Sequence, residues 1–509
     1  MVKLRHNPGL ADTSRVIHFD PRFQQLDQDL QRVHNRLLQP FESLSASYEV
    51  VQDYVKSIQD IIQDSGRALV GVSGRNRCGK SATINSLLHA NIARTGRAGQ
   101  CTVVTTEYHG RRVDQVEPFL AEVVFYSPTT RREIITSLVH DYFGTTDATI
   151  TQEYNATRED GDPYEQDSVI RYLMSLLKDE GHPDFESADR MHEFFADLKP
   201  CRNAYIVDLI MLRIEELLES HTGTNDTLII ESPTATHLLA SLEGFDSDIL
   251  QSDGAPAASM FRLVSKIRFH LSSPLTDIGV SFLDAPRLSN LPLRIAPYAR
   301  AMTHLLVLTE APRALVDPNV RPSIRMADVF LGANRNTVII THSDDIDWPQ
   351  MPGASDRERN PEALRLMENR SRSQERWFAE KLFEDSLSQA PVHSISNSQY
   401  KKHRIGYLEG NPPVMTAEAT GIPALRSRLA TFANDTRLEA KKLLLNDTIP
   451  SLLETLQRFA LDQSITAAGG ELPSLQGKLL QILPVVRDIL HGSVQHHFDD
   501  LWEEYYGPF

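Results

Sequence analysis

Residues 71–81 read Gly-Val-Ser-Gly-Arg-Asn-Arg-Cys-Gly-Lys-Ser, and the spacing Gly-x-x-x-x-Gly-Lys-Ser runs from Gly74 to Ser81. Glycines at these positions let successive backbone N–H groups turn toward a polyphosphate, the lysine reaches its β- and γ-phosphates, and the serine hydroxyl ligates Mg²⁺. An apolar run at 68–72 precedes the loop and an amphipathic segment at 81–88 follows it. Because this is the strand–loop–helix order that such a loop requires, the sequence predicts a nucleoside-triphosphate site.

The composition is that of a globular protein, with 41% hydrophobic and 24% charged residues. No stretch approaches the roughly 18 uncharged apolar residues of a membrane span, and no apolar run follows the charges of the first residues, so we expect neither a transmembrane segment nor a secretory signal. Cys78, Cys101 and Cys201 are the only cysteines and lack the spacing of metal ligands. These features predict an intracellular location, cytoplasmic, nuclear or both.

The net charge of −16, from 52 Lys and Arg against 68 Asp and Glu, disfavours broad binding to nucleic acid or to an anionic membrane. The basic run at 401–404, Lys-Lys-His-Arg, is interpreted as a solvated loop. We therefore find no strong nucleic-acid signal in the sequence.

Apolar runs of strand length alternate with helical patterns along much of the chain. The predicted strands are 68–72, 101–108, 121–126, 278–284, 303–309, 337–341 and 392–396. Continuous apolar runs of this kind indicate a parallel sheet that is covered on both faces. The predicted fold class is therefore α/β, with a doubly wound, mostly parallel sheet.

Helical periodicity predominates in the rest of the chain. Predicted helices span 23–37, 51–62, 131–143, 168–178, 188–198, 204–220 and 260–271, then 443–461, interrupted at Pro450, and 475–506. These patterns predict five parts: an N-terminal arm with bundle helices (1–64), a first head segment (65–127), a large helical insertion (128–276), a second head segment (277–430) and a helical trunk (431–509).

Two further oxygen ligands for Mg²⁺ are predicted beside Ser81. Thr102 follows the first helix after the loop, where a switch threonine would complete the metal's shell. Asp284 begins Asp-Ala-Pro at the end of the strand 278–284, where an Asp-x-Pro-Gly element orients the metal's waters and senses the γ-phosphate.

The last two strands carry residues that are predicted to recognise the base. The segment 341–344, Thr-His-Ser-Asp, matches a Thr-Lys-x-Asp element, whose aspartate accepts from guanine N1–H and the exocyclic amine. The segment 396–398, Ser-Asn-Ser, follows the final strand, and its residues, Ser396 and Asn397 first, are predicted to contact the base or ribose. Because ligands bind at the carboxyl edge of open α/β sheets, this order of elements predicts a GTP site.

Several segments together resemble the dynamin superfamily of large P-loop GTPases, and within it the nuclear GTPase SLIP-GC-like branch. They are Gly-Lys-Ser-Ala-Thr-Ile-Asn-Ser-Leu-Leu at 79–88, Cys-Thr-Val-Val-Thr-Thr-Glu at 101–107, Phe-Leu-Asp-Ala-Pro-Arg-Leu-Ser-Asn at 282–290, Thr-Glu-Ala-Pro-Arg-Ala-Leu-Val-Asp at 309–317 and Thr-Gly-Ile-Pro-Ala-Leu-Arg at 420–426. The resemblance implies a GTPase head, a helical bundle built from segments before and after it, and nucleotide-controlled self-association as a homodimer through the head. It leaves any other protein partner unknown.

The motifs and the resemblance give one set of candidate residues. The nucleotide-binding residues are Gly74, Arg75, Asn76, Arg77, Cys78, Gly79, Lys80, Ser81, Ala82, Thr341, His342, Asp344, Ser396 and Asn397. The catalytic residues are Lys80, Arg77 and Thr102, and the metal ligands are Ser81, Thr102 and Asp284. The predicted cofactor is Mg²⁺, with GTP as the substrate and GDP as the product.

Two departures from the family pattern affect the predicted activity. Arg287 replaces the glycine of Asp-x-Pro-Gly, whose flexibility lets the backbone amide reach the γ-phosphate, and His342 replaces the lysine that packs on guanine. We therefore expect binding to be better preserved than hydrolysis. Arg77 is a candidate for stabilising transition-state charge, or else points to solvent or to a structural carboxylate.

Two other residues have a functional and a structural interpretation. Cys78 is interpreted as a small loop filler rather than a nucleophile, because no histidine partner is indicated. Glu231 looks like a catalytic carboxylate after a strand, but Ser-Pro follows it, so we interpret it as a helix-start residue.

The sequence thus predicts a dynamin-like GTPase with weakened hydrolysis. The alternatives are a degenerate member that acts as a nucleotide-binding or nucleotide-free scaffold, and an ATP-using P-loop enzyme.

Overall fold

The computed structural model describes most of the chain in two compact units. The described residues are 21–40, 67–75, 77–95, 104–112, 114–143, 169–170, 172–174, 176, 187–198, 203–222, 226–245, 260–284, 301–332, 335–345, 356–384, 390–408, 411–461 and 472–506. The first unit comprises residues 1–11, 69–277 and 281–425, and the second comprises 12–68, 278–280 and 426–509.

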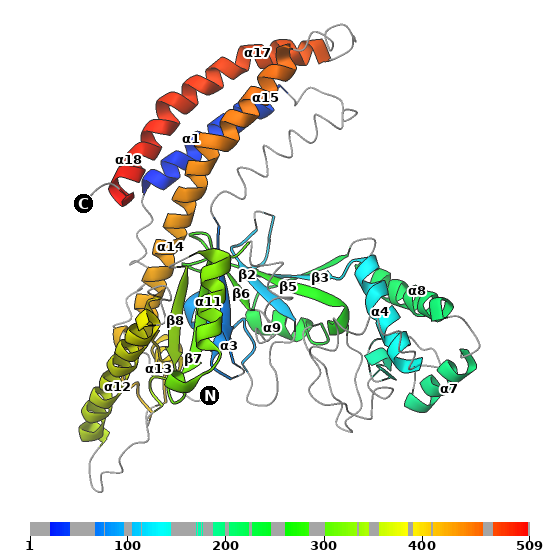
Figure 1. Ribbon diagram of the computed structural model, residues 1–509, viewed down its shortest axis with the longest axis vertical. Coiled ribbons are helices and arrows are strands. Elements are labelled where there is room, and N and C mark those ends of the chain that lie inside the picture. The colour runs from blue at the N-terminus through cyan, green and yellow to red at the C-terminus, as the bar shows by residue number, and fades with distance from the viewer. Residues whose placement is uncertain are drawn as a thin grey trace. The chain divides into compact units, whose positions relative to one another are not determined.

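The first unit is built on one sheet, in which nine strands are described, in the order β4-β3-β5-β2-β6-β1-β7-β8-β9 (Figure 1). The strands are β1 (Ala68–Gly74), β2 (Thr105–His109), β3 (Phe119–Phe125), β4 (Thr227–Ser232), β5 (Val264–Leu271), β6 (Val280–Asp284), β7 (His304–Glu310), β8 (Asn336–Thr341) and β9 (Val392–Ser394). β7 runs parallel to β1 and to β8, β8 runs parallel to β9, and β2 runs parallel to β5, whereas β3 is antiparallel to both β4 and β5 and β2 is antiparallel to β6.

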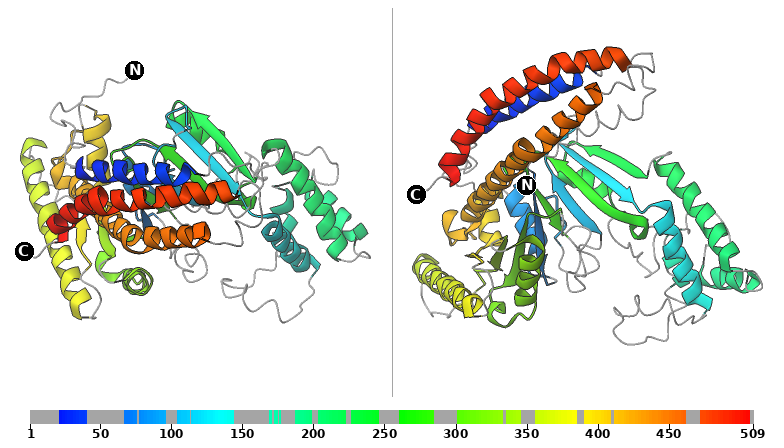
Figure 2. Two further views of the ribbon diagram at one scale, coloured as in Figure 1. Left: turned by 90° about the horizontal axis from the view of Figure 1, so that it is seen from above. Right: turned by 45° about the horizontal axis from the view of Figure 1, so that its top comes forward.

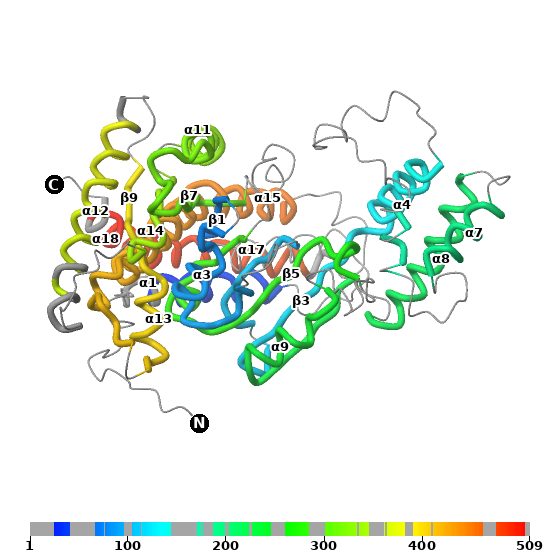
Figure 3. Tube along the Cα trace, turned by 90° about the horizontal axis from the view of Figure 1, so that it is seen from below, coloured from blue at the N-terminus to red at the C-terminus, as the bar shows by residue number. Residues whose placement is uncertain are grey.

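Helices cover both faces of this sheet, as expected for strands with almost continuously buried residues. Figure 3 shows α11 (Val320–Leu331) on one side of β1 and β7 and α3 (Lys80–Leu88) on the other. The remaining helices around the sheet are α9 (Ala235–Ser241), α12 (Asp356–Glu384) and α13 (Asn397–Ile405), with short 3₁₀ turns at Phe261–Leu263, Ala314–Val316 and Glu418–Thr420. This arrangement confirms the predicted α/β fold class.

Three helices of the predicted insertion pack together: α4 (Pro128–Phe143), α7 (Ala188–Leu198) and α8 (Asn203–Thr222). Tyr142 of α4 stacks on Phe195 of α7 with ring centroids 4.3 Å apart. Arg131 of α4 is buried and pairs with Glu215 of α8 at 2.8 Å and with Asp226 at 2.9 Å. Aromatic packing and a neutralised buried arginine therefore hold these helices to one another.

Two local predictions in this part of the chain were wrong. Residues 260–271, predicted as a helix, form a 3₁₀ turn followed by strand β5, because polar and apolar side chains alternate along it and pair with neighbours on both sides. Glu231 is not a helix-start residue, because it lies inside β4, and α9 begins only after Thr234, whose side chain accepts from the His237 N–H.

Charged side chains on β2, β3 and β5 form a network across these strands, in which the two carboxylates are buried and the cations partly exposed. Glu107 accepts from Lys266 at 2.9 Å and Arg268 at 3.1 Å, and Glu122 pairs with Arg268 at 3.3 Å. Burial alone would raise the pKa of Glu107, but hydrogen bonds from His109 and Lys266 bring it to about 2. These carboxylates therefore stay charged in the fold and tie neighbouring strands together.

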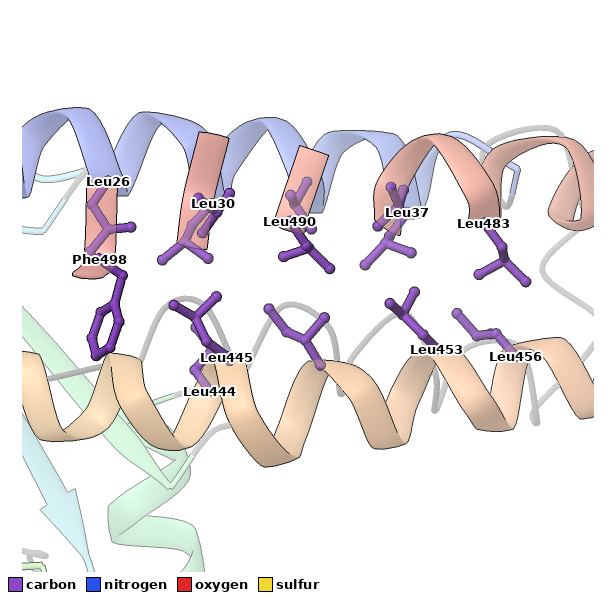
Figure 4. Close-up of a cluster of buried hydrophobic side chains, with 14 of the residues drawn as sticks. Leu26, Leu30, Leu37, Leu444, Leu445, Leu453, Leu456, Leu483, Leu490 and Phe498 are labelled. Carbon is purple, nitrogen blue, oxygen red and sulfur yellow. The ribbon is translucent and has the colours of Figure 1, made fainter. Parts of the chain in front are cut away.

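Three long helical segments are described in the second unit, each with an apolar stripe. They are α1 (Pro21–Leu38); α14 (Ile422–Leu443), whose start belongs to the first unit, followed by α15 (Ile449–Leu461); and α17 (Leu472–Ile489), followed by α18 (Gln495–Tyr506). Figure 2 shows α1 beside α17–α18 in both views. Leucines from all three segments pack together in the core of this unit, as Figure 4 shows for Leu37, Leu453 and Leu483. The predicted helix 51–62 lies outside the described residues.

The helix that contains Pro450 does not break there. A π-helical turn at Leu444–Thr448 joins α14 to α15, and a similar turn at Leu490–Val494 joins α17 to α18. A proline lacks an N–H and clashes with the preceding turn, and a wider turn just before it relieves both problems. No helix in the described ranges is both long and apolar enough to cross a membrane.

Candidate functional site

The loop after β1 turns sharply from the central strand into α3. A side chain at Gly74, where φ is 153°, would place its Cβ 2.6 Å from both Cys78 Sγ and the Leu308 carbonyl oxygen. Gly79 has a φ of 86°, a conformation that L residues rarely adopt, and it directly precedes α3. Both glycines are therefore required by the backbone path, and the N-terminus of α3 lies at the carboxyl end of β1.

Lys80 is the first residue of α3 and folds back over the loop. Its ammonium donates to the carbonyl oxygens of Gly74 at 3.0 Å and Arg75 at 3.1 Å. A positive charge therefore lies at the inner edge of the loop. If a phosphate were bound, the Lys80 ammonium would donate to charged phosphate oxygens instead of these neutral carbonyl oxygens. Hydrogen bonds between two charged groups are stronger.

The two residues before Gly79 have different surroundings. Arg77 is exposed and has a φ of 69°, a left-handed conformation that costs roughly 1–2 kcal/mol in a residue with a side chain. Cys78 is buried, and this burial raises the pKa of its thiol to about 11. The thiol therefore stays protonated at neutral pH. Because the thiolate is the nucleophilic form, Cys78 fills space in the loop and does not act as a nucleophile.

The end of β8 is fastened to the loop. Thr341 is fully buried, and its hydroxyl lies 2.8 Å from the Cys78 carbonyl oxygen and 3.2 Å from that of Thr309. His342 adopts a left-handed φ of 56°, and its Nε2 lies 3.6 Å from the position of a Cβ on Gly79. The predicted base-recognition segment and the phosphate loop are thus neighbours.

Asp344 lies beside the start of α13. Its Oδ2 accepts from the Ser398 hydroxyl and from Gln399 Nε2 at 3.4 Å. Ser396 is fully buried and caps α13 by accepting from the Gln399 N–H, while Asn397 donates to Thr83 Oγ1 at 3.0 Å. Ser398 belongs to the predicted segment 396–398, and in the structure its hydroxyl donates to the Asp344 carboxylate.

A cavity of about 470 Å³ lies between α3, the segment after β8, and α13. The predicted residues Ala82, His342, Asp344 and Asn397 line it, together with Asn85 and Lys401, which the sequence did not indicate. Lys401 belongs to the basic run that we interpreted as a solvated loop, but this run lies in α13, and its His403 is buried. The cavity thus has both acidic and basic groups in its wall.

Two of the predicted oxygen ligands for Mg²⁺, Ser81 and Asp284, are within the described residues. Asp284 ends β6 and is almost fully buried. β6 lies beside β1 in the sheet, and Ser81 is the second residue of α3, which follows the loop after β1. A hydroxyl and a carboxylate are ligands that Mg²⁺ prefers, so these residues fit the ion.

Some predicted residues cannot be placed. Asn76, Thr102 and Arg287 lie outside the described residues. Within the ranges that the structure describes, no group of three or more His, Cys, Asp and Glu side chains is arranged to hold a metal.

The fold and the site define a class: an open, mostly parallel α/β sheet with a Gly-x-x-x-x-Gly-Lys-Ser loop at its carboxyl edge. Neither models of known protein families nor curated proteins match this chain. Two solved structures of an oligomerised bacterial dynamin pair, described as providing a mechanism for long-range sensing and tethering of membranes, are similar to it at 12% identity, with TM-scores of 0.40 and 0.38. Each comparison covers 98% of this chain and 68% of the other. At these values we base the function on the site alone.

Proposed function

We propose that this chain is a dynamin-like GTPase, which binds GTP and hydrolyses it to GDP and phosphate. The observation that carries the proposal is the meeting of three sequence-distant segments at one sheet edge. The loop after β1, the segment after β8 and the start of α13 adjoin there, beside a cavity of about 470 Å³. A volume of this order accommodates a nucleoside, with the phosphates directed toward the loop.

The loop would hold the phosphates through its backbone and Lys80. The N-terminus of α3 presents backbone N–H groups, and the helix dipole favours an anion there. The Lys80 ammonium would exchange its two carbonyl acceptors, at 3.0 and 3.1 Å, for phosphate oxygens. Both contributions depend on charge and on the loop conformation rather than on the base.

Asp344 would select guanine. A carboxylate accepts hydrogen bonds only, and guanine offers N1–H and an exocyclic amine side by side, whereas adenine has an acceptor at N1. Ser398 and Gln399 hold Oδ2 of Asp344 in place at the cavity wall. With adenine, the carboxylate would be left without a donor, which costs free energy. The site therefore favours guanine over adenine.

For hydrolysis, water would attack the γ-phosphate in line with the leaving oxygen. Arg77 is exposed at the loop, so its guanidinium can turn toward the phosphates and offset charge in the transition state. Ser81 and Asp284 would hold Mg²⁺, which, when bound, neutralises phosphate charge. We further propose nucleotide-dependent self-association through the first unit, in an intracellular setting; membership of the SLIP-GC-like branch stays a prediction.

A single-turnover assay tests the proposal. We expect wild-type protein in excess over GTP to release phosphate, Lys80→Ala to release almost none, and Lys478→Ala on α17 to match wild type. Light scattering on the same samples should show a larger mass with GTP than without nucleotide. GTP binding without phosphate release, even at high protein concentration, would instead support a non-hydrolysing scaffold.

A further inference from the structure

Helix α12, which separates β8 from β9 in the sequence, is anchored beside the sheet in two places. Phe378 is buried in the cluster that includes Val338 and Ile340 of β8. About three turns before Phe378, Met367 packs against Met415 in a second buried cluster. Figure 3 shows α12 alongside β9. The helix is therefore a fixed support, and Arg370, Gln374 and Glu375, which lie between these anchors, bond to the segments after the strands or to the strand ends.

Arg370 of α12 reaches the segment that carries Asp344. Its guanidinium donates to the carbonyl oxygens of His342 at 3.2 Å, Ser343 at 2.8 Å and Asp345 at 2.5 Å. Burial lowers the pKa of Arg370, while the charges of Asp344 and Asp345 act in the opposite direction. Three carbonyl groups of one short segment thus converge on one planar cation, whose several N–H groups lie in a fixed fork.

This convergence has a consequence for the backbone. His342 is in the left-handed region at a φ of 56°, which is unfavourable for a residue with a side chain. The Ser343 N–H donates to the Ile395 carbonyl at 3.2 Å, so the segment is bonded on its other side as well. Without the guanidinium, the three converging carbonyl oxygens would repel one another. The backbone of this segment would then move to a conformation without the left-handed φ at His342.

The next turn of α12 holds the neighbouring strand ends. Gln374 is buried and donates to the Ala311 carbonyl after β7 at 2.6 Å, and Glu375 accepts from the Ser394 N–H at the end of β9 at 3.0 Å. Positions 370 and 374 share one face of the helix and 375 follows directly after 374, so a single rigid element bonds to the ends of β7, β8 and β9.

We propose that Arg370 is a positioning residue for base recognition: it holds the backbone of 342–345 so that the Asp344 carboxylate presents its acceptors to the cavity. The inference rests on the proposed guanine site and adds to it a residue far from Asp344 in the sequence that sets how well the site discriminates between bases. Lysine cannot replace it fully, because one ammonium cannot bond three carbonyl groups in the plane of a guanidinium.

Two measurements test the proposal with Arg370→Ala, Arg370→Lys and the control Arg376→Ala, whose arginine is 83% exposed on the same helix. Calorimetry with GDP and with inosine diphosphate, which lacks the exocyclic amine, gives the preference for guanine. Hydrogen exchange of the peptide that contains 341–345, in the nucleotide-free protein, reports the backbone directly. Thermal unfolding shows that each variant is folded.

We expect Arg370→Ala to bind GDP about tenfold more weakly, to lose most of its preference for GDP over inosine diphosphate, and to exchange faster at 341–345, with Arg370→Lys between it and wild type. Arg376→Ala should match wild type in all three. A folded Arg370→Ala protein with wild-type exchange at 341–345 would overturn the proposal, whatever its nucleotide affinity. A wild-type protein that does not distinguish the two nucleotides would overturn the proposed guanine site, while faster exchange in Arg370→Ala would still support the backbone role.

Discussion

Replacing Asp344 by asparagine changes one atom at the cavity wall and probes the proposed choice of base. Asparagine has the shape of aspartate but carries an NH₂ group in place of one carboxylate oxygen. In the structure, Ser398 and Gln399 both donate to Oδ2, so the amide is expected to keep an oxygen toward them and to turn its NH₂ group toward the ligand.

The size of the effect follows from the bonds that change. A hydrogen bond to a charged group contributes roughly 1.5–3 kcal/mol, and the guanine amine would then face a donor rather than an acceptor. A total of about 2–4 kcal/mol corresponds to a rise of roughly 30- to 1000-fold in the Kd for GDP. Xanthine has a carbonyl where guanine has its amine, so xanthosine diphosphate should bind Asp344→Asn more tightly than it binds wild type.

Titration calorimetry with GDP and xanthosine diphosphate measures both effects, and Asp345→Asn is a matched control at the neighbouring position of the same wall. The control should keep its preference for GDP. If Asp344→Asn binds GDP as wild type does, then Asp344 does not contact the base and the assignment of the cavity is refuted.

The remaining predictions concern the loop and the helical unit. At pH 7.5 iodoacetamide should label Cys78 much more slowly in folded protein than in urea, since burial raises its pKa to about 11; fast labelling of the folded protein, measured by peptide mass spectrometry, would contradict this. Burial would raise the pKa of Asp29, but hydrogen bonds from Ser493 and His497 hold it below its ordinary 3.8. Its contribution is therefore present above about pH 4 and lost as pH falls through the lower folded value, so Asp29→Ala should destabilise the helical unit by about 1–3 kcal/mol at pH 7 and by less in acid, as thermal unfolding at several pH values would show. Leu479→Ala, at a fully buried position of the leucine core, should cost about 2–5 kcal/mol in urea unfolding, and a loss below 1 kcal/mol would mean that this core is not formed as described.

The centre of the fold was predictable because its signals are local. The apolar runs at β1, β6, β7 and β8 are continuous, and each lies within a few residues of its predicted place. The order of the motifs after these strands follows from the sequence as well. The proximity of Thr341 and Asp344 to the loop then follows from the parallel direction of β1, β7 and β8.

The error at 260–271 shows where local reasoning failed. Ile267, Phe269 and Leu271 alternate with Lys266 and Arg268, which is the two-residue period of a strand, but the apolar positions also fit part of a helical pattern. What decides the outcome is pairing with β2 and β3, whose carboxylates neutralise the two cations. Such partners lie more than 100 residues away and leave no local signal.

The contribution of Arg370 was not predictable for a related reason. α12 has a polar sequence that resembles an exposed helix, and nothing in it indicates that one arginine bonds three carbonyl groups of another segment. Every residue has the same backbone carbonyl group, so the sequence does not show which carbonyl groups a side chain will bond. The loop conformation at His342, with its positive φ, is likewise visible only in the folded chain.

The central claim is that the cavity and the loop together bind a guanine nucleotide. The most direct measurement is calorimetric titration of the purified wild-type protein with GDP and, separately, with ADP in magnesium buffer. The account predicts saturable heat with GDP and at least tenfold weaker binding of ADP, because the Asp344 carboxylate finds no donor on adenine N1. No heat with GDP, or equal affinity for the two nucleotides, would contradict it.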